Sequence, residues 1–412
     1  MNDRKFIASF ILVIIFEILM ILIRPLGLSL FKVSITLLVW LAFYFAFSAF
    51  VKNYDIFKKD LPKYVFTVLG IMIGWNIINI FRSLISGEGT LTTLFGNSNT
   101  SLALLVPFTM AFSFDKVNLR SFNIFFIWLI PVSIVLYLIF VLLSNDPLNL
   151  YWNKAFQLLI YETAFLIILI PLQSKRNIFI IVTGTLLLSW LAVITEYRVA
   201  ILRILLLYLL LIPVYYYMRK NARWIPVVVL LTLFVPFYLI KTSIESKVSP
   251  FEKFLSRFED MEMGVDTRTF LYQEVFEDLK NDNKLFTGRG SNGTYYSPYF
   301  DETGDDASHR LSVEVGILAI FLKGGFIAVA LYLTILCMAI YQALFRSKNY
   351  YVFCIGLMLV VHALLLFISN PLDYSCYNMA IWFFTGVCLS KKISSLDNSE
   401  INNILIDANQ LS

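Results

Sequence analysis

The chain has 412 residues and a formal net charge of +5 at pH 7; 59% of its residues are hydrophobic and 15% are charged. Soluble domains carry about 25% charged residues, so this composition excludes an ordinary soluble protein. Apolar runs close to the roughly 20 residues that cross a bilayer as a helix recur along the chain. The sequence therefore predicts an all-α polytopic membrane protein.

The apolar runs define about twelve predicted transmembrane helices. In chain order they lie near 6–23, 31–51, 64–81, 101–114, 122–143, 155–172, 178–195, 199–218, 224–240, 324–345, 351–369 and 373–390. The first run lacks a small-residue cleavage pattern and is expected to be a retained span. All four cysteines fall within predicted spans, so neither a disulfide framework nor a cysteine metal site is expected.

These runs divide the chain into four predicted regions. Residues 1–240 hold nine spans, 241–323 form one large loop, 324–392 hold three further spans, and 393–412 form a tail. The tail is short and polar from Ser394 onward, without an obvious packing pattern, and is expected to be disordered.

Lysine and arginine are distributed unevenly between the two sets of short loops. One set holds seventeen of them and the opposite set holds five. Those five are Arg24, Lys32, Arg82, Lys154 and Arg198. Because cytoplasmic loops carry the excess of Lys and Arg, both termini are predicted to be cytoplasmic and the large loop to lie outside.

The large loop, 241–323, is the main polar stretch of the chain. It holds ten Lys/Arg, fifteen Asp/Glu and His309, one of only two histidines. Its net negative charge argues against a nucleic-acid partner. Polar groups gather here and at the adjoining helix ends, so we expect the function to reside there.

Two arginines stand near the outer end of one predicted span. Arg198 begins the span, and Arg203 lies five residues later, about 7.5 Å deeper along a helix. An arginine inside a span usually faces a partner or a polar cavity. These residues could reach back to the headgroups or pair with Glu196, or they could form an anion site for phosphate or pyrophosphate.

Within the loop, Arg268 precedes a helix-like run at 270–279. Its stripe of Leu271, Val275 and Leu279 suggests a helix that lies on the membrane surface or caps the spans. Arg268 could bind an anion or form an ion pair with Asp266.

Gly288, Arg289 and Gly290 come next, followed by Tyr295 and Tyr296. The Gly-x-Gly pattern predicts a tight turn with positive φ and is not a nucleotide fingerprint. The two tyrosines could also stack on a sugar ring. The acidic residues at 301–306 are interpreted as a solvated loop, and no metal site is expected.

Two residues near the end of the loop are candidate proton acceptors. His309 is of the type best suited to proton transfer near neutral pH, and Glu314 can act as a base if its surroundings raise its pKa. His362 lies among aliphatic residues within a predicted span and is interpreted as structural.

Three of these features occur in a particular order. An arginine, Arg198, stands at an outer helix start. A second arginine, Arg268, precedes a helix and the Gly-x-Gly turn, and Lys323-Gly324-Gly325 comes just before a span. In this order they resemble the O-antigen polymerase and O-antigen ligase superfamily, whose members are bacterial inner-membrane proteins with about a dozen spans and a large late periplasmic loop.

The resemblance implies a glycosyltransferase that needs neither a metal nor a cofactor, with a glycan on undecaprenyl pyrophosphate as donor. Arg198 and Arg268, with Arg203 and Arg289 as further candidates, would hold the pyrophosphate, and a histidine would accept the proton. In the ligases this histidine lies about eleven residues before the glycine of the following span; counting back from Gly325 reaches Glu314. This departure favours a repeat-unit polymerase over a ligase.

Three alternatives remain open at this stage. A ligase would transfer the glycan to lipid A core, while a transporter or a scaffold would catalyse no transfer. Twelve-span transporters commonly have a long connection between their halves, but here that connection is only 173–177. For a polymerase, the expected partners are the lipid-linked oligosaccharide, membrane lipid, a flippase and a chain-length regulator.

Overall fold

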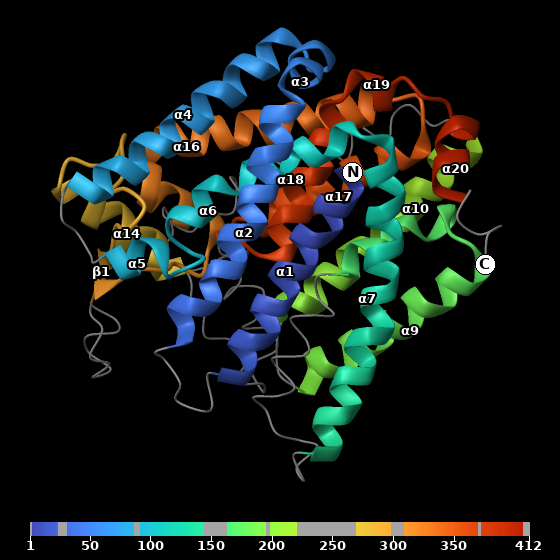
Figure 1. Ribbon diagram of the computed structural model, residues 1–412, viewed down its shortest axis with the longest axis horizontal. Helices are drawn as coiled ribbons and strands as arrows, with labels where there is room; N and C mark the ends of the chain where they lie inside the picture. Colours follow the sequence, from blue (N-terminus) through green and yellow to red (C-terminus); the bar gives the residue numbers. More distant parts are fainter. Residues whose placement is uncertain are drawn as a thin grey trace, which may run out of the picture.

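The computed structural model describes most of the chain as helices, together with one pair of short strands (Figure 1). The described residues are 2–23, 31–85, 91–143, 163–194, 198–220, 269–297, 309–369 and 372–406.

The N-terminal half contains α1 (Asn2–Ile23), α2 (Phe31–Lys52), α3 (Tyr54–Asp60), α4 (Lys63–Ile85), α5 (Leu91–Phe95), α6 (Ser101–Leu105), the 3-10 helix η1 (Val106–Phe114), α7 (Lys116–Leu143), the 3-10 helix η2 (Ala164–Leu172), α9 (Lys175–Ile194) and α10 (Arg198–Lys220). The remainder contains α14 (Thr269–Asn281), β1 (Tyr295–Tyr296), β2 (His309–Arg310), α16 (Gly316–Tyr341), the π-helical turn η5 (Gln342–Arg346), α17 (Tyr350–Leu365), α18 (Cys376–Leu389), α19 (Lys391–Ser394) and α20 (Asn398–Ile406).

Within the described ranges, six helices are long and apolar enough to cross a bilayer. They are Val33–Lys52, Lys63–Ile85, Lys116–Ile139, Lys175–Ile194, Val199–Met218 and Gly316–Arg346. Three shorter apolar helices accompany them, at Ser101–Phe114, Tyr350–Leu365 and Cys376–Leu389. An all-α membrane protein is confirmed. The total of twelve spans stays a prediction, because the ninth, at 224–240, lies outside the described residues.

Helix α18 forms the centre of the bundle, and every one of its residues is buried. A helix that is apolar on all sides is typical of a core position, and α18 packs against η1, α16, α17 and α1. Aromatic rings fill the space around it. Phe383 of α18 stacks on Phe122 of α7 at 4.5 Å between ring centroids, with the planes 5° apart.

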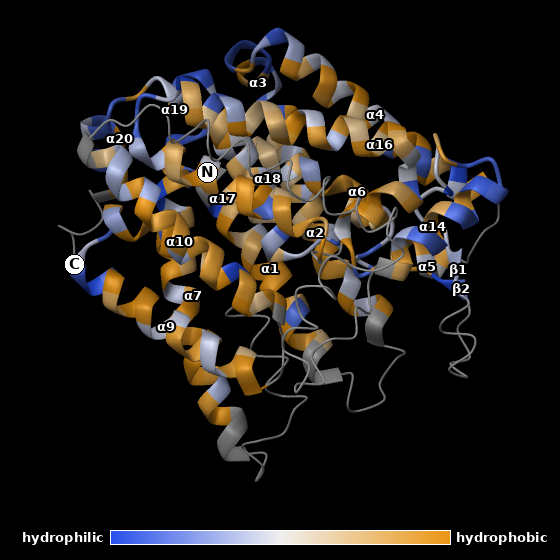
Figure 2. Cartoon of the chain, turned by 180° about the vertical axis from the view of Figure 1, so that it is seen from behind, coloured by the Kyte–Doolittle hydropathy of each residue, from blue (hydrophilic) through white to orange (hydrophobic). Residues whose placement is uncertain are grey.

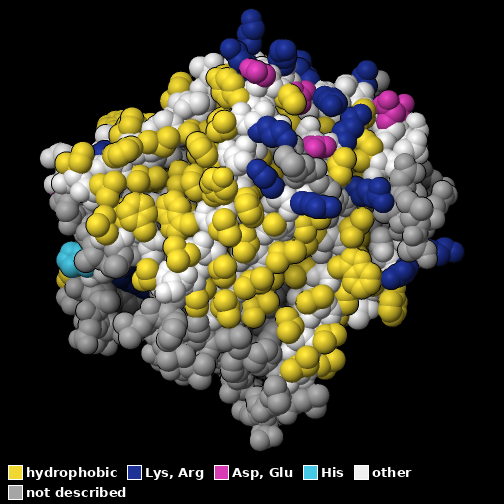
Figure 3. Space-filling model, viewed as in Figure 1, with side chains coloured by type: hydrophobic (Ala, Val, Ile, Leu, Met, Phe, Trp, Pro, Cys, Tyr) yellow, Lys and Arg dark blue, Asp and Glu magenta, His cyan; other side chains and the backbone are white. Residues whose placement is uncertain are grey.

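Polar and apolar side chains are separated along the bundle (Figure 2). Hydrophobic residues follow the long helices, whereas hydrophilic residues gather near α3, α19 and α20 and again around α14. Lys and Arg side chains cluster around α3 and the N-terminal end (Figure 3). The uneven loop charges therefore correspond to a basic end of the folded bundle, although the side of the membrane it faces stays a prediction.

The predicted boundary between the large loop and the following span was placed too late. Helix α16 begins at Gly316, so Lys323 lies inside a helix and is buried instead of ending a loop. The segment 316–322 is apolar and is covered by protein, including α14. The charged Lys323 that follows it made the sequence resemble the end of a loop.

The prediction of a disordered tail from Ser394 was also wrong for the residues up to 406. Helix α20 starts with a capping box, in which Asp397 accepts the Glu400 amide at 2.8 Å and Glu400 accepts the Asp397 amide at 2.9 Å. Ile401 and Leu405 are buried, and α20 packs against α7 and α17. The apolar residues are spaced for one helix face, which a composition-based reading overlooked.

Replacing the capping residue should loosen this helix. In Asp397→Ala the Glu400 amide loses its acceptor, so amide exchange over 398–406 should rise several-fold by mass spectrometry. Asn403→Ala is the matched control, because Asn403 is exposed on the same helix and stands away from the cap. Equal exchange in both variants would show that the cap does not hold α20.

Candidate functional site

Helix α16 is broken near its middle. Gly325 has φ 66° and ψ −166°, which is not helical, so α16 consists of a first half, 316–324, and a second half, 326–341. A break leaves the last carbonyls of one half and the first amides of the other without helical partners. In an apolar bundle these groups must be satisfied by another part of the chain.

The segment 285–291, called here the 285–291 turn, supplies the donors for the first half. The Arg289 amide donates to the Leu322 carbonyl at 2.8 Å, and the Gly290 amide donates to the Lys323 carbonyl at 2.9 Å. Amides of the Gly-x-Gly sequence therefore donate to the carbonyls that the break leaves without donors from the helix itself.

The same turn supplies the acceptors for the second half. The Phe326 amide donates to the Leu285 carbonyl at 2.9 Å, and the Ile327 amide donates to the Phe286 carbonyl at 3.3 Å. Both ends of the break are thus joined to one segment that lies about forty residues earlier in the chain.

Glycines make this close approach possible. Gly288 and Gly290 have φ values of 63° and 89°, in the region that glycine adopts without strain. A Cβ on Gly288 would lie 2.5 Å from the carbonyl carbon of Lys323, and one on Gly325 would overlap the Phe286 carbonyl. The geometry therefore shows the tight turn that the Gly-x-Gly pattern predicted.

Helix α4 holds the turn from the other side. Arg82 donates from Nη1 to the Thr287 carbonyl at 2.7 Å and from Nη2 to the Gly288 carbonyl at 2.8 Å. Trp75 Nε1 donates to the Gly324 carbonyl at 3.0 Å. In the sequence, Arg82 stood out only as one of the five basic residues in the loops predicted to face outward, and that exception to the charge bias was the available signal.

Further polar groups gather where α4, the turn and α16 meet. Lys323 is buried and its Nζ donates to the Ser291 carbonyl at 2.7 Å. The Ser291 amide donates to the Asn79 carbonyl at 3.3 Å. Ser291 Oγ and Asn79 Nδ2 are buried without a hydrogen-bond partner in the described part of the chain. This junction therefore concentrates polar atoms beside an otherwise apolar bundle.

Arg289 lies in the turn, but its charge is matched by acids. It forms ion pairs with Asp278, at 2.9 Å, and with Asp282, and it donates to the Thr294 carbonyl. These contacts fasten the turn to the end of α14. A role for Arg289 in pyrophosphate binding stays a prediction, and the observed contacts are those of a structural residue.

The apolar stripe of α14 faces the protein. Leu271, Val275 and Leu279 are buried in a cluster that includes Val315 and Leu322. Tyr272 also donates to the Phe367 carbonyl at 2.6 Å, at the end of α17. Through this stripe α14 caps the spans, which is one of the two positions considered for it.

Strands β1 and β2 bring predicted site residues together. They pair antiparallel, with Tyr295 opposite Arg310 and Tyr296 opposite His309. The rings of Tyr296 and His309 lie 5.6 Å apart, and both side chains are exposed.

Tyr295 is buried on the other face of the strand pair. Burial raises the pKa of its hydroxyl, as do the charges of Glu274 and Glu314, whereas Arg310 lowers it and hydrogen-bonds to it. Glu314 itself is exposed. His309 and Glu314 therefore lie in one short segment, 309–314, that leads directly into α16.

Arg203 lies inside the bundle. It is buried, and its guanidinium carbon stands 4.2 Å from the centre of the Tyr377 ring. The Tyr377 hydroxyl and His362 Nδ1 are 2.9 Å apart, and His362 Nε2 lies 3.0 Å from the Tyr332 hydroxyl. His362 thus links α16, α17 and α18, as the structural interpretation expects. Arg198 begins α10, while its side chain and Arg268 lie outside the described residues.

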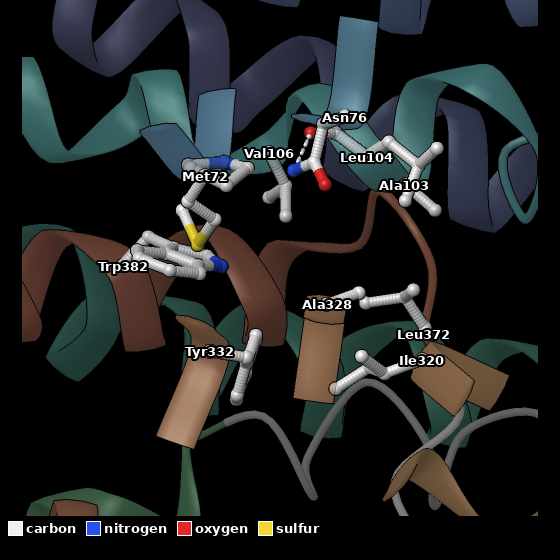
Figure 4. A pocket seen from close by; sticks show the side chains of 11 residues that line it. Met72, Asn76, Ala103, Leu104, Val106, Ile320, Ala328, Tyr332, Leu372 and Trp382 are labelled. Atoms are coloured by element: carbon white, nitrogen blue, oxygen red, sulfur yellow. Dashed lines mark hydrogen bonds between the residues drawn. The ribbon is translucent and has the colours of Figure 1, made fainter. Parts of the chain in front are cut away.

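A small cavity of about 20 Å³ lies among α4, α6, η1, α16 and α18 (Figure 4). Ile320 and Ala328 line it from the two sides of the break, and Tyr332 and Trp382 complete one wall. Asn76 faces it while donating to the Leu104 carbonyl at 2.9 Å. A space of this size holds about one water molecule and cannot hold a sugar.

Metal ligands do not gather in the described ranges: no group of three or more His, Cys, Asp or Glu residues could hold an ion there. The acidic stretch at 301–306 lies outside those ranges.

A side chain at Gly325 should damage the junction. Gly325→Ala forces alanine into positive φ, which costs about 1–2 kcal/mol, and places its Cβ against the Phe286 carbonyl. The thermal midpoint of the purified protein should therefore fall. Gly74→Ala on α4 is the control, since nothing lies within 4 Å of its Cβ and helix propensity favours alanine. Similar midpoints for both variants would contradict the importance of the break.

Comparison with known proteins gives one match. Residues 183–333 match a family model described as O-antigen ligase, and this region contains most of α9, all of α10 and α14, the strand pair and the break in α16. A search of curated proteins finds no match to the chain. Over residues 183–333 the chain is therefore similar to the O-antigen ligase family, and this match supports the resemblance to the O-antigen polymerase and O-antigen ligase superfamily.

Proposed function

We propose that the protein polymerises lipid-linked oligosaccharide repeat units into a surface polysaccharide. The observation that carries this proposal is the family match over 183–333, in a chain built of membrane-length helices. The reaction would take place at the outer face of the bacterial inner membrane, with undecaprenyl pyrophosphate as the donor's carrier. It would require no metal.

The proposed reaction is a single transfer. The acceptor sugar hydroxyl attacks C1 of the donor sugar, the bond from C1 to the pyrophosphate oxygen breaks, and undecaprenyl pyrophosphate leaves with the bonding electrons. Arg198 and Arg268 would bind the pyrophosphate with charge-assisted hydrogen bonds, which strengthen as negative charge develops on the leaving group. Both arginines lie within the matched region.

We assign these two arginines the main role because the other candidates are otherwise engaged. Arg289 is paired with two carboxylates, and Arg203 is buried against an aromatic ring. Arg203 lies about 7.5 Å from Arg198 along α10, so it would support the site from below.

The proton of the acceptor hydroxyl would pass to His309 or Glu314. Both stand just before α16, in the segment 309–314, whose first two residues pair with β1. A histidine is suited to this task near neutral pH, and a carboxylate can perform it where its surroundings raise its pKa. The exposed pair of Tyr296 and His309 offers an aromatic surface on which a sugar could stack.

The proposed topology places both termini in the cytoplasm. The cluster of Lys and Arg around α3 and the N-terminal end supports it, since cytoplasmic rims carry that excess (Figure 3). The segment 269–315 would then face outward, where lipid-linked repeats become available after transfer across the membrane. A flippase and a chain-length regulator are the partners that such a reaction implies.

A ligase is the second candidate, because the matched family model carries that description. Glu314 stands where the resemblance expects a ligase histidine, and this favours the polymerase. Purified protein incubated with a lipid-linked repeat unit distinguishes the classes. Polymer formed with or without a chelator supports the proposal, transfer only to lipid A core supports the ligase, and an unchanged repeat unit supports transport or scaffolding.

Replacing either of the arginines proposed to bind the pyrophosphate should abolish polymer formation. Arg198→Ala and Arg268→Ala should each eliminate long chains while single repeat units persist, as judged by gel analysis of polysaccharide from cells. Arg176→Ala is the control, because Arg176 lies in the first turn of α9, before the matched region, and contacts Trp128. Normal chain length in both test variants would refute the mechanism.

Substituting the two candidate bases one at a time should show which of them accepts the proton. One general base suffices for the transfer, so either His309→Ala or Glu314→Gln should lower the rate about 10²–10⁴-fold while the other stays near the parent. Ser312→Ala, at an exposed position between them, controls for disturbance of the segment. Parent rates in both test variants would exclude this segment as the source of the base.

A further inference from the structure

Four phenylalanines form a row beside the break in α16. The row consists of Phe276 in α14, Phe286 in the turn, Phe321 in the first half of α16 and Phe326 in its second half. Their ring centroids are 6.4 Å apart for Phe276 and Phe321, 4.7 Å for Phe321 and Phe326, and 5.9 Å for Phe326 and Phe286. The row therefore spans α14, the turn and both halves of α16.

Most of this aromatic surface is uncovered. Phe286 is 68% exposed, Phe326 44% and Phe276 41%, whereas Phe321 is buried beneath them. Leu285, beside it in the turn, packs against the buried cluster, but the side chain of Phe286 does not join the core. Contiguous exposed apolar surface of this kind marks an interaction site.

The row differs from the apolar stripe of α14. That stripe is buried against α16, so it already has its protein partner. Phe276 lies on the flank of the helix, and it contacts the row instead. The burial of α14 therefore leaves the exposed phenylalanines unexplained.

The row continues a surface that faces lipid. The end of α4 that binds the turn exposes Ile78, Phe81 and Ile85, at 49%, 58% and 84%. Both α4 and α16 are membrane-length apolar helices, and hydrophobic side chains cover the face where they lie (Figure 3). Phe326 is the first exposed residue after the break, so lipid contact along α16 begins there.

Charged residues complete the pattern. Lys280 and Lys284 are exposed near Phe276 and Phe286 in sequence, and so are the acids Glu277 and Asp282, so charges of both signs border the row. Segments that lie in the bilayer interface bury an apolar face of Phe, Trp or Leu between the lipids and keep a charged face in water. This composition fits the bilayer interface and not the surface of a soluble partner.

We propose that the phenylalanine row is a membrane-interface anchor, which inserts between the lipid headgroups of the outer leaflet and holds the segment 269–297 on the bilayer surface. The occupant is bulk bilayer lipid. The anchor would keep the turn and the break in α16 at headgroup depth. It does not depend on the polymerase assignment.

The test uses a fluorescent label at two positions of the full-length protein in lipid nanodiscs that contain anionic phospholipid. Cys337→Ala removes the one exposed native cysteine; the other three are buried. Phe286→Cys is labelled with an environment-sensitive nitrobenzoxadiazole. The control is Asn281→Cys, an exposed position five residues after Phe276, which lies about 140° around the helix from it.

At position 286 the label should show blue-shifted emission, quenching by spin-labelled phospholipid and protection from iodide. At position 281 iodide should quench strongly and the lipid quencher weakly. Equal behaviour at both positions, with full access to iodide, overturns the anchor. Lipid quenching at 286 that appears only after a lipid-linked oligosaccharide is added also overturns it, because the surface then belongs to the carrier. Neither readout requires catalysis, so the outcome is independent of the proposed function.

Discussion

The structure depends on the hydrogen bonds that satisfy the backbone amides and carbonyls at the break in α16. Exposed backbone groups in an apolar environment cost several kcal/mol each, so a helix cannot simply stop within a membrane protein. The 285–291 turn supplies donors to one half and acceptors to the other. Arg82 of α4 then binds two carbonyls of the same turn. The polar segment and the helix bundle are therefore a single hydrogen-bonded unit.

This junction fixes the position of the segment that holds the two proposed bases. The turn is fastened to α14 by Arg289 and its two carboxylates, and the strand pair follows it directly. The candidate bases, His309 and Glu314, consequently stand at a fixed place beside the start of α16. Charges inside the bundle serve a different purpose, since Arg203 packs on an aromatic ring and belongs to a buried network.

Sequence reasoning succeeded where one residue type has one physical meaning. Gly288 and Gly290 predicted a turn because positive φ is cheap only for glycine, and the turn is present.

Sequence reasoning failed where composition was averaged over a window of residues. Lys323 made 316–323 resemble a loop, although those residues form a buried helix. The polar composition of the tail likewise hid the capping box at Asp397.

By itself, the sequence determined the membrane class, the basic end of the bundle and the family resemblance, because hydropathy, loop charge and ordered motifs are properties of short stretches. Only the tertiary structure decided which polar groups meet. Arg82 and the 285–291 turn lie about two hundred residues apart in the chain, and no local pattern relates them. The need to satisfy the backbone of a broken helix brings them together, and that need exists only once the helix is buried.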